Sequence, residues 1–248
     1  MVGTITRVGT CVRRLAQVGI KSAGVTLSWS TSLAPIAQGL ERTNFHGRTV
    51  SLRGGVGAAA GAVMAAIETG RLTRGASAPA LSASHRGARV GLAATLATAA
   101  GGCAGLVDDL DAGAHDGDVP AKGLRGHLGA LRQGRVTTGV LKIGVIGAGA
   151  VAAGGLLAAG RRRPGRTASA VADAVTSAVV IASWANLHNL LDLRPGRALK
   201  TGLLVTTPLA VAPGGEASRV LAAGAAGAAA AVLKPSAPPT AAATRQAY

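Results

Sequence analysis

The side chains best suited to chemistry lie in one short acidic segment. Five of the chain's ten acidic residues fall within eleven positions, namely Asp108, Asp109, Asp111, Asp116 and Asp118. Adjacent carboxylates repel each other, and acids at the C-terminal end of a helix oppose its dipole. A divalent cation that prefers oxygen ligands, such as Mg²⁺, would relieve both effects and could hold a phosphate. The pair Asp108 and Asp109 is therefore a candidate metal site, with a solvated acidic loop as the alternative.

Two basic segments follow the acidic one. Residues 122–127 and 134–142 combine Lys and Arg with Gly, so the backbone can approach a phosphate while a cation such as Lys122 neutralises it. A flexible basic loop is the alternative interpretation. An earlier polar segment, residues 44–55, is expected to be a loop that leads into a helix.

A third set of polar side chains occurs late in the chain. Asn186, Asn189 and Asp192 recur at three-residue spacing, so they can share one face of a helix. Polar groups at the end of an apolar helix are costly unless they are paired or functional. We expect these residues to contribute to a site, whereas His188 is expected to have a structural role.

The elements that must position these residues are apolar helices. Only 2% of the chain is aromatic and 15% is charged, whereas 48% is hydrophobic and Gly accounts for 37 of 248 residues. Soluble domains normally fill their cores with large side chains, whereas helices in a bilayer pack through small ones. The low charge and long apolar tracts exclude intrinsic disorder. The composition therefore predicts an all-α polytopic membrane bundle of six or seven spans rich in Ala and Gly, and self-association is plausible for such helix faces.

The expected spans follow from apolar stretches of membrane-spanning length. They are residues 54–70, 87–107, 136–160, 167–187, 201–212 and 217–233, with a weaker candidate at 15–37. We expect residues 1–40 to form a weak N-terminal span or leader, 41–234 the membrane domain and 235–248 a disordered tail. Two spans separate each polar segment from the next, so residues 41–53, 108–135 and 187–200 should emerge on the same side of the membrane.

The net charge of +16 has two explanations. Nucleic-acid binding would need aromatic side chains to stack on bases, and the chain has almost none. Its basic residues instead fall in short clusters between apolar stretches, as in loops that flank membrane spans. We therefore expect a lipid bilayer as partner and no nucleic acid.

One soluble alternative is a dinucleotide-binding protein. Residues 142–151 have the sequence of a strand that enters a glycine turn, and Asp173 lies about 20 residues beyond Gly154, near where an acid is required. No second strand is evident to carry that acid, and the apolar tract continues to Gly160.

The four polar segments, taken in order, resemble the polyprenyl-phosphate N-acetylhexosamine-1-phosphate transferases. This family includes phospho-N-acetylmuramoyl-pentapeptide transferase and the polyprenyl-phosphate GlcNAc-1-phosphate transferases. The resemblance covers roughly residues 40–200 and depends on the order and spacing of the motifs at residues 44–55, 107–109, 122–127 with 137–142, and 186–192. The continuation after Asp192 departs from the family pattern, and we expect a divergent relative that is shortened at its C-terminus.

The resemblance implies a membrane enzyme that moves a sugar 1-phosphate from a UDP-sugar to a polyprenyl phosphate and releases UMP. It implies catalytic and Mg²⁺-binding roles for Asp108, Asp109 and Asp192. It further implies substrate-binding roles for four residues: Asn44, Lys122, Asn186 and Asn189. The site would lie at the cytosolic face of the plasma membrane, where a water-soluble nucleotide and a lipid can meet. The alternative is a non-catalytic membrane relative that binds a lipid phosphate or a partner protein.

Overall fold

The fold is a helical bundle with one small β-hairpin. The computed structural model describes residues 2–43, 47, 49–74, 81–111, 123–161, 167–191 and 196–233. In chain order the elements are α1 (Val2–Ser32), the 3-10 helix η1 (Ala34–Leu40), β1 (Glu41–Thr43), β2 (Thr49–Ser51), α2 (Arg53–Arg74), α3 (Leu81–Asp111), α4 (Gly123–Arg132), α5 (Thr138–Arg161), α6 (Thr167–Leu191), α7 (Arg197–Val211) and α8 (Glu216–Val232).

Every apolar segment expected to span the membrane forms a helix, but fewer helices than expected are suited to a bilayer. Three of the described helices are long and apolar enough to cross one: residues 85–111 within α3, all of α5 and all of α6. The expectation of six or seven spans is therefore not supported. Helices α7 and α8 have only 15 and 17 residues, and a helix that crosses a bilayer needs about 20. The all-α class stands, with three candidate spans.

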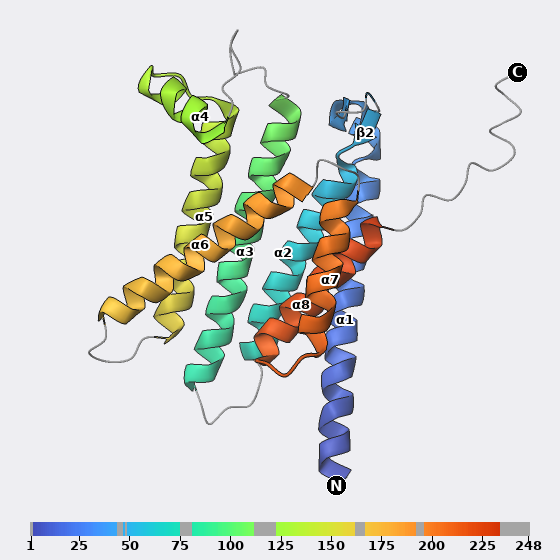
Figure 1. The fold of residues 1–248 in the computed structure, drawn as a ribbon. Helices are drawn as coiled ribbons and strands as arrows, with labels where there is room; N and C mark the ends of the chain where they lie inside the picture. Colours follow the sequence, from blue (N-terminus) through green and yellow to red (C-terminus); the bar gives the residue numbers. More distant parts are fainter. Residues whose placement is uncertain are drawn as a thin grey trace, which may run out of the picture.

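The long helices alternate in direction, so the polar segments gather at one end of the bundle (Figure 1). The hairpin, the C-terminal end of α3, the helix α4 and the N-terminal end of α5 all lie at the top of the view, with the end of α3 between α4 and the hairpin. Helix α6 runs obliquely toward this end. This arrangement is the one expected for segments that are separated by pairs of helices.

Small residues allow α1, α2 and α8 to pack closely. A Cβ atom added at Gly61 of α2 would lie 2.7 Å from the carbonyl oxygen of Ser22 on α1. One added at Gly227 of α8 would lie 2.7 Å from the carbonyl carbon of Gly19 on α1. Val18 and Ala65 are among the residues buried in this core. The packing has the character expected of small-residue interfaces between helices.

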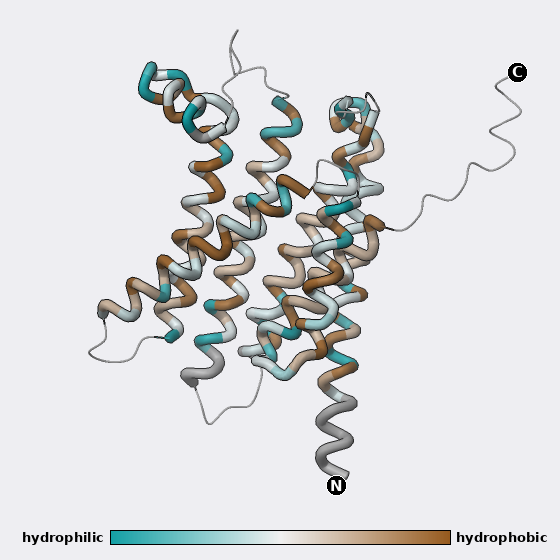
Figure 2. The backbone as a smooth tube through the Cα atoms, in the orientation of Figure 1, coloured by the Kyte–Doolittle hydropathy of each residue, from teal (hydrophilic) through white to brown (hydrophobic). Residues whose placement is uncertain are grey.

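Helix α6 is apolar but has an exposed surface. None of its residues is buried, and Val171, Val175 and Val179 are each more than half exposed. Figure 2 shows hydrophobic colour along much of α5 and α6. Such a surface needs an apolar covering, and a bilayer around α3, α5 and α6 would supply one.

One segment differs from its expected structure, and a second has the helix expected of a span rather than the strand of the dinucleotide-binding alternative. The polar segment at residues 44–55 was expected to be a loop, but its described part contains β2, which pairs antiparallel with β1 so that Glu41 faces Ser51. Residues 142–151 lie within α5. The strand that a dinucleotide-binding turn requires is therefore not formed there.

Candidate functional site

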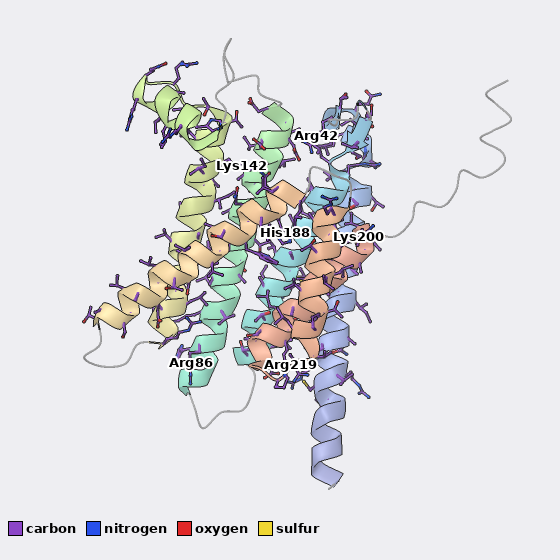
Figure 3. The ribbon with its side chains drawn as sticks, in the orientation of Figure 1. Arg42, Arg86, Lys142, His188, Lys200 and Arg219 are labelled. Atoms are coloured by element: carbon purple, nitrogen blue, oxygen red, sulfur yellow. The ribbon has the colours of Figure 1, made fainter. Side chains whose placement is uncertain are left out.

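A lysine joins three helices at the end of the bundle where the polar segments gather. Lys142 lies in the second turn of α5 and its side chain is only 16% exposed. Its Nζ donates one hydrogen bond to Asp108 Oδ2 of α3 at 2.7 Å and another to Asn189 Oδ1 of α6 at 2.6 Å. Residues that are 34 and 47 positions from Lys142 in the sequence thus meet at one ammonium group. Figure 3 shows Lys142 near the same end of the molecule as Arg42.

The neighbouring acid has its own cation. Arg42 Nη1 of β1 lies 2.5 Å from Asp109 Oδ1 of α3, and the two side chains are 38% and 27% exposed. The Nε atom of Arg42 is buried and has no hydrogen-bond partner among the described residues. The hairpin therefore brings a guanidinium to the end of α3, and one of its donors remains unused within the described chain.

Two threonines at the start of α5 complete the polar network. Thr138 donates a hydrogen bond from its hydroxyl to Asp111 Oδ2. The backbone N–H of Val140 donates to the Thr137 hydroxyl at 3.2 Å, so Thr137 caps α5. The same hydroxyl lies 2.9 Å from His127 Nδ1, which ties α4 to α5.

A shallow groove of about 60 Å³ lies between α3 and α5, and Lys142 contributes to its lining together with Cys103, Val107 and Leu141. Its lining is mainly apolar. Pockets for whole small molecules are several times larger, about 300 Å³ or more. The groove can therefore hold a short length of hydrocarbon beside the ammonium group, but not a complete ligand.

The described residues do not by themselves form a metal site. They contain no group of three or more His, Cys, Asp or Glu side chains placed to hold an ion. Asp108 and Asp109 instead face Lys142 and Arg42. The Mg²⁺ that the family resemblance implies stays a prediction, because Asp192, its third expected ligand, lies outside the described residues.

The remaining expected site residues divide into two groups. Asn44, Lys122 and Asp192 lie outside the described residues, as do Asp116 and Asp118. Asn186 is exposed on α6, three positions before Asn189. Among the described residues, the first acidic motif and the later Asn-rich motif are joined through Lys142, which bonds to Asp108 and to Asn189. The expected convergence of Asp108 and Asp109 with Asp192 stays a prediction.

Sequence reasoning included Lys142 and Thr138 in the basic segment at 134–142 without assigning either a role in the site, and it did not select Arg42. Lys142 is charged in a helix of 24 residues whose other charged residue, Arg161, lies at its very end. A charged side chain in such a helix is costly and marks a functional position or a pairing. That signal was present in the sequence, whereas nothing local identified Arg42 as the partner of Asp109.

His188 packs within its own helix. Its ring centroid lies 4.7 Å from that of Trp184, and its Nδ1 lies 3.1 Å from the Trp184 carbonyl oxygen. These contacts agree with the structural role that we expect for it.

Comparisons with protein-family models, with curated proteins and with solved structures return no match. What the chain does must therefore be inferred from its own residues and their geometry.

Proposed function

We propose that this chain transfers a sugar 1-phosphate from a UDP-sugar to a polyprenyl phosphate at the cytosolic face of the plasma membrane and releases UMP. The observation that carries the proposal is the meeting of Asp108, Lys142 and Asn189 from three helices. Two of these helices, α3 and α5, also line an apolar groove beside the ammonium group. A cation and hydrogen-bonding groups next to an apolar groove suit a ligand with a phosphate at one end and a hydrocarbon chain at the other.

The proposed reaction places heavy electrostatic demands on a site. An oxygen of the polyprenyl phosphate attacks the sugar-linked phosphorus of the UDP-sugar, a new P–O bond forms, and the bond to the UMP oxygen breaks. Phosphoryl transfer of this kind is catalysed mainly by positioning and by neutralising charge. Lys142 would exchange Asp108 for a phosphate oxygen, and the partly exposed guanidinium of Arg42 would add a second positive charge near it.

The proposal gives no step to Mg²⁺ because the described residues contain no group of three or more acidic, His or Cys side chains placed to hold an ion. Whether transfer requires Mg²⁺ is decided by the test below, which compares Mg²⁺ with EDTA. Asp192, the third acid to which the resemblance gives a role, directly follows Leu191 in the sequence.

A second candidate function is supported by the same ion pairs. Asp108 and Asp109 are neutralised by Lys142 and Arg42 without any ligand. A scaffold that had lost catalysis but still bound a lipid phosphate would tolerate this arrangement. The alternative is therefore a non-catalytic membrane relative.

Release of UMP tests the two candidates directly. The purified full chain in detergent is incubated with undecaprenyl phosphate and a panel of UDP-sugars, with Mg²⁺ or with EDTA. The transferase proposal expects UMP together with a lipid-linked sugar pyrophosphate. If no pairing yields UMP while undecaprenyl phosphate still raises the melting temperature, the non-catalytic alternative is favoured.

Two variants separate the site from general effects on folding. Asp108→Asn is expected to reduce transfer at least 100-fold, because it removes the charge that holds Lys142 in place. Asp173→Asn changes an acid in the N-terminal half of α6, far from the network in sequence, and should leave transfer unchanged. Equal activity of the two variants would refute the assigned role of Asp108.

A further inference from the structure

Helix α4 exposes leucines along one side and arginines along another. It is a helix of ten residues and lies across the end of α5 rather than continuing it (Figure 1). Ala130 is 3% exposed, whereas Leu128 and Leu131 are 45% and 43% exposed. Two leucines three positions apart lie on the same side of a helix. The leucines therefore form an apolar strip that no described part of the chain covers.

The other edge of the exposed surface is basic. Arg125 and Arg132 are exposed and lie seven positions apart, so they share a face next to the leucines. Arg135 follows and is exposed as well. The sequence from 123 to 137 contains no Asp or Glu. A surface with leucines along one edge and arginines along the other is typical of helices that lie in the interface of a membrane.

The position of α4 in the fold matches this chemistry. The helix is followed within six residues by α5, which is apolar enough to span a bilayer. His127 fastens it to Thr137 at the first turn of α5, with 2.9 Å between Nδ1 and Oγ1. The end of a spanning helix lies at the level of the lipid headgroups. α4 is therefore held at the depth where leucines meet acyl chains and arginines meet phosphates.

We propose that α4 is an interfacial helix that binds the surface of a bilayer containing anionic phospholipids. Leu128 and Leu131 enter the boundary between headgroups and acyl chains, and Arg125, Arg132 and Arg135 contact the headgroup phosphates. The inference depends on a bilayer around α3, α5 and α6. It is independent of the transferase proposal.

Spin labels test the proposal in the full chain. Cys11 and Cys103 are replaced by Ala, and single cysteines are introduced at Leu128 and Leu131. The labelled proteins are reconstituted in nanodiscs of phosphatidylcholine, with or without phosphatidylglycerol. Accessibility to oxygen, which concentrates in acyl chains, is compared with accessibility to a water-soluble nickel chelate.

Reference labels calibrate the measurement. A label at Val151 reports the middle of a candidate span, where 66% of the side chain is exposed, and one at Glu41 reports the hairpin. We expect labels at Leu128 and Leu131 to favour oxygen in discs with phosphatidylglycerol, at a shallower depth than the label at Val151.

The arginines are tested by neutralisation. Arg125→Gln together with Arg132→Gln should lower the ratio of lipid-bound to free α4 about fivefold for each arginine, which corresponds to about 1 kcal/mol per charge. Val136→Cys, whose side chain is 61% exposed, provides a further label that does not alter α4 itself.

Three results would overturn the inference. Preferential access of the nickel chelate to Leu128 and Leu131 would place α4 in water. Shielding from both reagents would mean that another protein surface, such as a second copy, covers the helix. The same depth with and without phosphatidylglycerol would rule out anionic headgroups as the partner.

Discussion

Replacing Gly227 by Ala should loosen the contact between α8 and α1. The added Cβ would lie 2.7 Å from the carbonyl carbon and 2.8 Å from the Cα of Gly19, and its nearest atom would be the Gly19 carbonyl oxygen. All three atoms belong to the backbone, so no side-chain rotation can make room. The helices must move apart instead.

The expected change in the free energy of unfolding is the difference between two opposing effects. Overpacking a tight interface costs about 1–3 kcal/mol, and a purely backbone clash belongs at the upper end. Ala is better than Gly in a helix by about 1 kcal/mol. The net loss for Gly227→Ala is therefore about 2 kcal/mol, or a melting temperature about 4–8 °C lower for a chain of this size.

The same substitution at a matched glycine should raise the stability of the protein. Gly147 lies inside α5 and has no atom within 4 Å of the position that a Cβ would take. Gly147→Ala should therefore gain the helix propensity alone, which is about 1 kcal/mol or 2–4 °C.

Thermal unfolding of the detergent-solubilised chain measures both changes. The fluorescence of Trp29 and Trp184 reports the transition. The reasoning is refuted if Gly227→Ala melts at or above the temperature of the unchanged protein, because the small-residue interface would then have room to spare.

Two further predictions concern ion pairs. The side chain of Glu68 is only 9% exposed and lies 3.6 Å from Lys21 Nζ and 3.3 Å from Arg71 Nη1, whose side chains are mostly exposed. Replacing both cations by Met leaves a buried carboxylate uncompensated and should therefore cost about 3–5 kcal/mol of stability, which is more than Glu68→Gln should cost. Equal melting temperatures of these two variants would contradict this. For Arg42 and Asp109, a double-mutant cycle on thermal unfolding with Arg42→Ala and Asp109→Ala should give a coupling of about 1 kcal/mol, since both side chains are partly exposed; a coupling of zero would mean that the pair does not hold the hairpin on α3.

The sequence predicted the helices well because apolar length and small-residue content are local properties. The segments at 87–107 and 167–187 lie within helices that are apolar enough to span a bilayer, and the segment at 136–160 differs from such a helix, α5, by only two residues at its start. The sequence analysis overestimated the number of spans. Helix α2 is long enough to cross a bilayer but not apolar enough, and α7 is too short. Helix α4 was not predicted because its first half lies in the glycine-rich basic segment at 122–127, which also suits a loop.

Composition, spacing and the alternation of apolar and polar segments were enough to predict an all-α chain whose acidic and Asn-rich motifs lie at the same end. Only the tertiary structure decided which groups touch there. Asp108 and Asn189 meet through Lys142, and Asp109 meets Arg42. The reason is physical: helix formation depends on neighbours within a few residues, whereas the position of an ammonium group between two helices depends on how closely small residues allow their backbones to approach.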